Sequence, residues 1–255
     1  MPYVKNKEGF SLFYEYFPKK NRPTLIFIHG LATDRTVWNS YIRRFREDYG
    51  ILALDLLGHG LSEKPPKKGM YRIGQFVRDL EHIIECLKIK QYYMVGYSLG
   101  GLVALKYQRS HKVGSLGVIL VSTALSYHDL TDSFILEASV ATCFPQAAYR
   151  LLDNGEDFSA VRSSLALYIK CLAKTPPRIA DYILENLKCY SWSGQLPKNL
   201  LVIIAYKDEI VKNRIARLCK DCKTVGGRHI AVIRKSDHII GMIREFICKR
   251  QTRRA

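Results

Sequence analysis

One short stretch, running from Gly96 to Gly101, constrains the fold of this chain more than any other. Its sequence is Gly-Tyr-Ser-Leu-Gly-Gly, and it separates an apolar segment typical of a buried strand from a segment with helical spacing. A turn this tight between a strand and a helix leaves no space for side chains at Gly96 and Gly100. The turn also strains the backbone of Ser98 and lifts its hydroxyl clear of the sheet. The pattern therefore predicts an exposed serine nucleophile at the carboxyl end of a strand.

The rest of the chain alternates between strand-like and helix-like segments. A hairpin over residues 2–17 is followed by strands expected at 24–28, 51–54, 92–95, 118–121, 200–205 and 229–233. Helices are expected at 35–47, where Asp34 is a good N-cap, and at 73–87, 212–220 and from 239 onward. This order predicts an α/β fold, with a mostly parallel sheet and helices on both faces. Ligands then bind beyond the carboxyl ends of the strands.

The alternation stops between residues 125 and 195. This stretch has no convincing strand and predicts short helices at 134–143, 146–152, 159–173 and 177–187. We expect residues 1–124 and 196–255 to form one core domain and residues 125–195 to form a helical insertion. The insertion can simply pack on the core, or it can act as a cap that covers an apolar pocket, and the two interpretations are compatible.

A serine hydroxyl needs a base within hydrogen-bond reach, and the base needs a carboxylate to orient it. Asp208 and His238 each follow a predicted strand, as Ser98 does, so all three are expected at the same edge of the sheet. His229 starts the last predicted strand and would therefore lie at the opposite edge. Asp129 is the alternative acid. The sequence thus predicts a triad of Ser98, Asp208 and His238.

Two further loops follow predicted strands. His29-Gly30-Leu31 can aim the backbone N–H of Leu31 at a neighbouring site, and His29 is expected to brace this loop rather than to react. Asp55 and His59 lie in the loop after the next strand. A metal or acid–base role is possible there, but an aspartate that accepts hydrogen bonds from nearby backbone N–H groups is the simpler interpretation.

Taken together, these motifs resemble the α/β-hydrolase superfamily over essentially the whole chain, and most closely its small, capped serine hydrolases of the carboxylesterase type. The residues that carry the resemblance are His29-Gly30-Leu31, Asp55 to Ser62, Gly96 to Gly101, Asp208 and His238. The resemblance implies ester hydrolysis through an acyl-enzyme, with an oxyanion hole formed by the N–H groups of Leu31 and Leu99, and no metal or organic cofactor. One departure from the family is that Asp237, rather than the common glycine, precedes His238.

Other reactions of the same triad stay open at this point: carbon–carbon bond hydrolysis, lactone opening, thioester hydrolysis (including acyl-carrier-protein esters), perhydrolysis and acyl transfer. A ligand receptor of hydrolase ancestry is a remote alternative. The serine at position 98 argues against epoxide hydrolases and haloalkane dehalogenases of this fold, which carry a carboxylate there.

Composition adds expectations about partners and location. The formal net charge is +17, but residues 125–195 hold six Lys/Arg and eight Asp/Glu, so the positive charge belongs to the core domain. Anionic substrates or peripheral contacts with anionic surfaces are compatible with this charge, and no specific nucleic-acid motif is present. Seven scattered cysteines without metal-binding spacing, together with no secretory signal and no membrane-spanning run, favour a cytoplasmic protein acting on a small-molecule ester.

Overall fold

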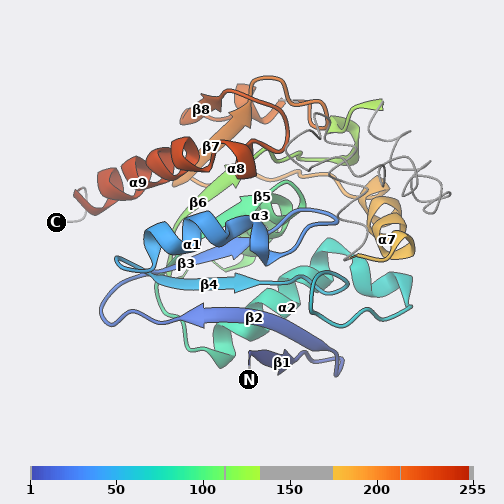
Figure 1. Ribbon diagram of the computed structural model, residues 1–255. Coiled ribbons are helices and arrows are strands. Elements are labelled where there is room, and N and C mark those ends of the chain that lie inside the picture. The colour runs from blue at the N-terminus through green and yellow to red at the C-terminus, as the bar shows by residue number, and fades with distance from the viewer. Residues whose placement is uncertain (1, 112, 133–174, 213, 253–255) are drawn as a thin grey trace, which may run out of the picture.

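The structure is a computed structural model, and it describes residues 2–111, 113–132, 175–212 and 214–252. Its centre is an eight-stranded sheet with the order β1-β2-β4-β3-β5-β6-β7-β8 (Figure 1). The strands are β1 (Tyr3–Lys5), β2 (Ser11–Phe17), β3 (Thr24–Ile28), β4 (Gly50–Leu54), β5 (Tyr92–Tyr97), β6 (Ser115–Val121), β7 (Leu200–Ala205) and β8 (Cys222–Val225). β2 pairs antiparallel with β1 and β4, whereas all pairs from β4 to β8 are parallel.

Helices cover both faces of this sheet, as the alternating sequence predicts. One face carries the short 3-10 helix η1 (Arg35–Trp38) with α1 (Asn39–Phe45), α8 (Ala231–Arg234) and α9 (Ser236–Thr252). The other face carries α2 (Ile73–Cys86) and α3 (Leu99–Ser110). The remaining described helices are η2 (Lys68–Tyr71), η3 (Tyr127–Asp129), α7 (Pro177–Lys188) and η5 (Arg214–Arg217).

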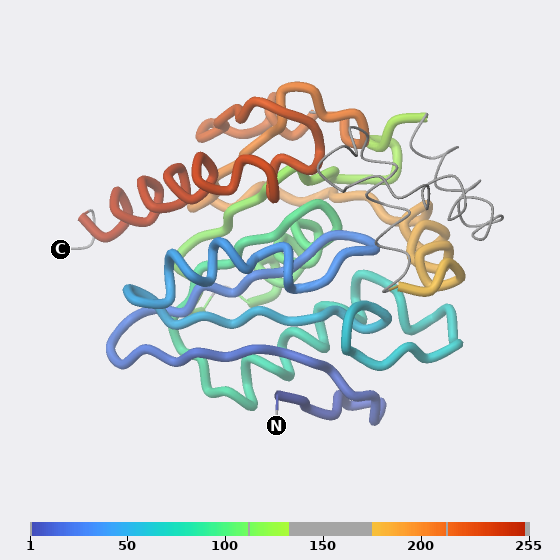
Figure 2. Tube along the Cα trace, in the orientation of Figure 1, coloured from blue at the N-terminus to red at the C-terminus, as the bar shows by residue number. Residues whose placement is uncertain are grey.

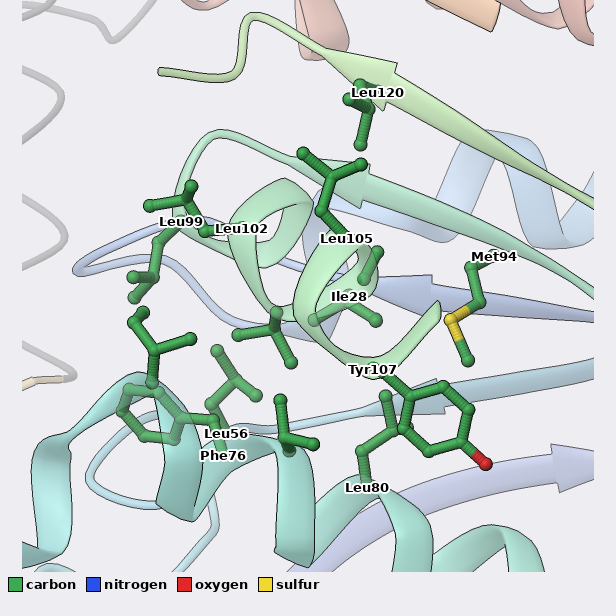
Figure 3. Close-up of a cluster of buried hydrophobic side chains, with 14 of the residues drawn as sticks. Ile28, Leu56, Phe76, Leu80, Met94, Leu99, Leu102, Leu105, Tyr107 and Leu120 are labelled. Atoms are coloured by element: carbon green, nitrogen blue, oxygen red, sulfur yellow. The ribbon is translucent and has the colours of Figure 1, made fainter. Parts of the chain in front are cut away.

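The central strands are apolar at nearly every position because each of their faces packs against helices. Alternate residues of β3 enter different cores: Leu25 and Phe27 pack on the α1 and α9 side, and Ile26 and Ile28 on the α2 and α3 side. Figure 3 shows the second core, where strand side chains meet those of α2 and α3. This double burial fixes the sheet between two helical layers and sets the positions of the loops at its edges.

Most predicted elements are confirmed, with small shifts at their ends. The hairpin, the strands up to β7 and the helix at 73–87 are present, and the side chain of Asp34 caps η1 by accepting a hydrogen bond from Thr36 N. The helix predicted at 212–220 is reduced to the single 3-10 turn η5.

The prediction for the last strand is wrong. It falls at Cys222–Val225, and residues 231–233 of the run predicted as a strand belong to the short helix α8 instead. Among the described strands β8 pairs with β7 alone, and it is half-exposed, so its sequence lacks the apolar run that marks the buried strands.

The predicted insertion is described only in part. α7 matches the helix predicted at 177–187, and it lies beyond the carboxyl ends of the parallel strands (Figure 1). It packs on η2, and the rings of Tyr71 and Tyr182 lie 6.1 Å apart. The helices predicted at 134–143, 146–152 and 159–173 lie outside the described residues. None of the helices in the described part of the chain is both long and apolar enough to cross a membrane.

A buried carboxylate on α2 makes the stability of this fold depend on pH. Burial raises the pKa of Asp79 to about 6, against hydrogen bonds from Asn6 and Gln75 that favour its charged form. Unfolding restores the ordinary pKa of 3.8, so the free energy of unfolding falls as the pH rises from about 4 to about 6. Above about pH 6 the folded protein carries the full cost of the buried charge.

We therefore expect Asp79→Asn to raise the free energy of unfolding at pH 8 by about 1–3 kcal/mol, because the amide keeps the shared acceptor oxygen without the charge. The gain should shrink toward pH 4. Urea unfolding at both pH values measures it, with the exposed Asp48→Asn as the control. A gain equal at pH 4 and pH 8 would show that the charge of Asp79 is not its cause.

Candidate active site

Ser98 occupies the sharp turn between β5 and α3. Its backbone has φ 50° and ψ −115°, a conformation strained for any residue other than glycine. The turn is fixed by backbone hydrogen bonds from Ser98 N to Val121 O (2.9 Å) and from Gly101 N to Ser98 O (3.0 Å). The predicted elbow geometry of Ser98 is therefore present, and the serine is held at the first turn of α3 at the carboxyl edge of the sheet.

The glycines around Ser98 are required by close backbone contacts. A Cβ atom on Gly96 would lie 2.5 Å from the carbonyl oxygen of Gly100, and one on Gly100 would lie 2.2 Å from the carbonyl oxygen of Ile28. A Cβ atom on Gly101 would lie 2.0 Å from the hydroxyl of Thr123. These approaches are closer than any real Cβ contact, so α3 can start against β3 and β6 only without these side chains.

The loop after β3 lies directly beside the elbow. A Cβ atom on Gly30 would lie 3.3 Å from the Cβ of Ser98 and 2.9 Å from the ring of Tyr97. Leu31 follows Gly30 in this loop, and Leu99 follows Ser98 as the first residue of α3. The two backbone N–H groups predicted to form an oxyanion hole therefore belong to two adjacent segments at the nucleophile.

His29 braces this loop, as predicted. Its Nδ1–H donates to the carbonyl of Gly30 (2.8 Å), and its Nε2 accepts from the backbone N–H of Leu56 (3.0 Å). Complete burial lowers the pKa of His29, and the neutral form is the one that satisfies both contacts. Thr33 donates from its hydroxyl to the same Gly30 carbonyl (2.9 Å), which ties both ends of the loop together.

Asp55 also has the structural role expected of it. Its carboxylate accepts from the backbone N–H groups of Arg35 (2.8 Å) and Leu61 (2.9 Å) and pairs with the Arg35 guanidinium (3.1 Å). His59 is fully buried beside His29, and burial holds its pKa well below the usual value. Among the described residues, no group of three or more His, Cys, Asp or Glu side chains could hold a metal ion.

A buried acid–histidine pair lies at the ends of β7 and β8. Both carboxylate oxygens of Asp208 lie 3.0 Å from Nδ1 of His229, and the carboxylate also accepts from the backbone N–H groups of Ile210 (3.0 Å) and Val211 (2.9 Å). The Asp208 side chain is fully buried and that of His229 is 5% exposed. Burial alone would raise the pKa of Asp208, but His229 and the two N–H donors together outweigh it and lower the pKa.

The choice of His238 as the partner of Asp208 is wrong. His238 is exposed in the first turn of α9, whereas His229 holds the contact with Asp208. The error follows from the misplaced last strand. Because β8 ends at Val225, the histidine that follows the strand at the carboxyl edge is His229.

The alternative acid, Asp129, is committed to a different network. Its carboxylate accepts from the backbone N–H of Leu125 (3.0 Å) and the hydroxyl of Ser126 (3.2 Å), and it pairs with Arg214 (3.1 Å). These bonds fasten the loop after β6 to the segment around η5. Asp129 therefore acts as a structural acid, and Asp208 is the carboxylate that pairs with a histidine.

Two contacts of His229 were not anticipated from the sequence. The carboxylate of Glu209 accepts from the backbone N–H of His229 (3.2 Å), so successive acids hold the side chain and the backbone of one histidine. The ring of Tyr97 packs on the His229 ring at 5.1 Å between centroids. Tyr97 directly precedes Ser98, so this contact brings the histidine to the elbow. Gly226-Gly227, a turn signal just before Arg228-His229, is the sequence feature that could have located this loop.

Sheet order, elbow, glycine-packed loop and terminal acid–histidine pair together define the α/β-hydrolase fold. Residues 23–148 match the family model described as the alpha/beta hydrolase fold. A solved structure described as a putative lipase (lip1) from Acinetobacter baumannii AYE has a TM-score of 0.79 at 19% identity, covering 98% of this chain and 91% of that one. The chain therefore has the α/β-hydrolase fold.

The curated relatives match shorter stretches. The 3-oxoadipate enol-lactonase 2 of Acinetobacter baylyi is 37% identical over 92 residues, which is 36% of this chain and 34% of the relative. Epoxide hydrolase 4 of Mus musculus is 27% identical over 103 residues, which is 40% of this chain and 29% of the relative. The chain thus spans about a quarter to a third of the length of the curated relatives it matches.

Proposed function

We propose that this protein is a serine hydrolase that cleaves carboxylic esters, lactones included, with Ser98 as nucleophile, His229 as base and Asp208 as the acid that orients the base. The observation that carries the proposal is the buried Asp208–His229 pair, whose histidine packs on Tyr97, next to the strained Ser98. Ser98, Asp208 and His229 follow β5, β7 and β8, so all three lie at the carboxyl edge of one parallel sheet.

The Asp208 contact determines which ring nitrogen reacts. Because the carboxylate engages Nδ1, that nitrogen carries the proton and Nε2 is left as the base. His229 takes the proton of the Ser98 hydroxyl through Nε2 as the oxygen attacks the ester carbonyl. The imidazolium that forms is stabilised by the adjacent Asp208 carboxylate.

The tetrahedral intermediate places negative charge on the former carbonyl oxygen. The backbone N–H groups of Leu31 and Leu99 are the donors for this oxyanion, because the Gly30–Leu31 loop lies against Ser98 and Leu99 directly follows it. His229 then protonates the leaving alkoxide, which leaves Ser98 acylated. In the second half of the reaction His229 activates water, which releases the carboxylic acid.

One of the relatives supports the inclusion of lactones in the proposed class of substrate. The name of the enol-lactonase describes an enzyme that acts on a lactone, which is a cyclic ester. Acyl transfer to Ser98 would open such a ring in the same way as it cleaves a linear ester. Epoxide opening in this fold uses a carboxylate in place of the serine, so residue 98 disfavours that reaction here. α7 lies beyond the strand ends, and its Ile179, Ile183 and Leu184 pack in the same apolar cluster as Leu99, which supports small to medium apolar substrates.

The test is hydrolysis of p-nitrophenyl esters from acetate to palmitate and of the lactone dihydrocoumarin, together with labelling by a fluorophosphonate. We expect turnover of at least one ester, and a single phosphonate adduct that mass spectrometry places on Ser98 and that is absent from Ser98→Ala. The ester with the highest kcat/KM then measures the acyl pocket. Turnover of no ester or lactone by a protein that still labels at Ser98 would contradict ester hydrolysis and favour carbon–carbon bond cleavage or thioesters.

A further inference from the structure

His229 comes to the candidate active site on a loop that begins with two glycines. Gly226 and Gly227 follow β8, and Figure 2 shows the chain turning in this loop between β8 and α8, at the edge where the parallel strands end. A Cβ atom on Gly226 would have no neighbour within 4 Å among the described residues, and Gly227 has a φ of 122°, which residues with side chains rarely adopt. The glycines have no side chains to pack, so the position of the loop depends on hydrogen bonds made further along it.

Glu209 provides such a bond at His229 itself. One carboxylate oxygen of Glu209 accepts a hydrogen bond from the backbone N–H of His229 (3.2 Å), and the other lies 3.8 Å from the guanidinium of Arg228. Because the acceptor is charged, this bond is stronger than one between neutral groups. The Glu209 side chain is 32% exposed, so it is partly shielded from the water that would compete for the bond. The carboxylate therefore fastens the loop at the residue that carries the imidazole.

The backbone of Glu209 is itself held in place. The hydroxyl of Thr131 donates to the Glu209 carbonyl (2.5 Å), and the backbone N–H groups of the next two residues, Ile210 and Val211, donate to the Asp208 carboxylate. Both Ile210 and Val211 are buried. Glu209 thus extends from a fixed segment after β7 to the glycine loop after β8, and it joins the segment that carries the acid to the segment that carries the histidine.

Three contacts together define where the His229 ring lies. Asp208 binds Nδ1 and the ring of Tyr97 packs against the imidazole, so both of these contacts act on the ring. Glu209 acts instead on the backbone from which the ring extends. A displacement of about 1 Å in a reacting group can lower a rate by about 10²-fold. The backbone contact therefore bears directly on the distance between Nε2 and the Ser98 hydroxyl.

We propose that Glu209 is a positioning residue, which holds the His229 loop so that Nε2 stays within reach of the Ser98 hydroxyl. The inference rests on the proposed function, in which His229 is the base. Glu209 touches no reacting atom, because its carboxylate engages the backbone N–H and Nδ1 is already bound to Asp208. Loss of its carboxylate should therefore lower kcat and leave KM nearly unchanged.

Two replacements of Glu209 test the hydrogen bond. Glutamine keeps an oxygen that can accept from the His229 N–H, and alanine does not. We expect kcat on the best p-nitrophenyl ester to fall by about tenfold or more in Glu209→Ala, with KM within about twofold, and to stay within about threefold of wild type in Glu209→Gln. Arg228→Gln removes the charged partner and keeps the N–H bond, so its kcat should also stay within about threefold, as should that of the exposed control Glu47→Ala.

A second measurement needs no turnover. The Nδ1–H proton of a histidine bonded to a buried carboxylate gives a far-downfield ¹H NMR signal when it is protected from water, and His229→Gln assigns that signal. We expect the signal in the wild type and in Glu209→Gln, and its loss through exchange with water in Glu209→Ala. Thermal unfolding shows that each variant is folded.

The inference is overturned if a folded Glu209→Ala keeps the kcat of the wild type, or if its kcat falls while the Nδ1–H signal is unchanged. It is also overturned if Glu209→Gln loses as much kcat as Glu209→Ala, because the hydrogen bond would then not be the cause. Failure of the proposed function looks different. The wild type would then turn over no ester, and the Nδ1–H signals of the two Glu209 variants would decide whether the carboxylate positions the ring.

Discussion

Replacing His229 with glutamine should lower kcat for ester hydrolysis by about 10³-fold or more, because glutamine cannot take the proton of Ser98. Glutamine is the informative replacement. Its side chain is of similar reach and can still donate to the buried Asp208 carboxylate, so the acid is not left unpaired. The measurement is kcat and KM on the best p-nitrophenyl ester, with thermal unfolding to show that the variant is folded.

His238→Gln is the matched control for this prediction. His238 is exposed at the start of α9 and contacts neither Asp208 nor His229, so kcat should stay within about twofold of wild type. A large loss in His238→Gln with little loss in His229→Gln would reverse the assignment of the base. Equal large losses in both would point to an effect on folding, which the unfolding curves would reveal.

Gly100→Ala should destabilise the protein by about 3 kcal/mol or more and should also remove activity. The added methyl group would lie 2.2 Å from the carbonyl oxygen of Ile28 and 2.5 Å from that of His29. Both atoms belong to the backbone and cannot rotate away as a side chain would. The end of β3 and the His29–Leu31 loop would have to move, and the Leu31 N–H would move with them. Denaturant unfolding and kcat on the same ester measure the two effects.

Gly241→Ala is the control for a glycine without such contacts. Gly241 lies within α9, and a Cβ atom there would have no neighbour within 4 Å. Alanine has the higher helix propensity, so this variant should be more stable by about 0.5–1 kcal/mol and fully active. A Gly100→Ala protein as stable as the wild type would show that β3 and α3 can separate at no cost, contrary to the packing described above.

The parts of this fold that could be predicted from sequence are those with strong local signals. Strands such as Thr24–Ile28 are buried at every position and almost entirely apolar, and α2 shows clear helical spacing. The elbow was predictable because steric exclusion at Gly96 and Gly100 depends on backbone geometry, which few sequences satisfy. Asp208 was predictable because it follows such a buried strand.

The histidine that pairs with Asp208 was not predictable in the same way, for a physical reason. An edge strand buries little side-chain surface, so Cys222–Val225 carries no apolar pattern, whereas the nearby run His229 to Ile233 does. Ala231 and Val232 of that run instead pack in the core from α8, and Ile233 is exposed. The predicted strand lay seven residues too far along the chain. This error placed His229 at the amino edge of the sheet and His238 at the carboxyl edge, where the structure has His229.

Position 98 combines a backbone conformation that favours glycine with a hydroxyl side chain that glycine lacks. The turn there has a φ of 50°, a value that glycine would adopt with far less strain. A chain selected for stability alone would therefore replace this serine, and random mutation followed by screening for thermal tolerance would tend to do so. If Ser98 is the nucleophile proposed above, selection for activity keeps a hydroxyl at that position in spite of the strain of the turn.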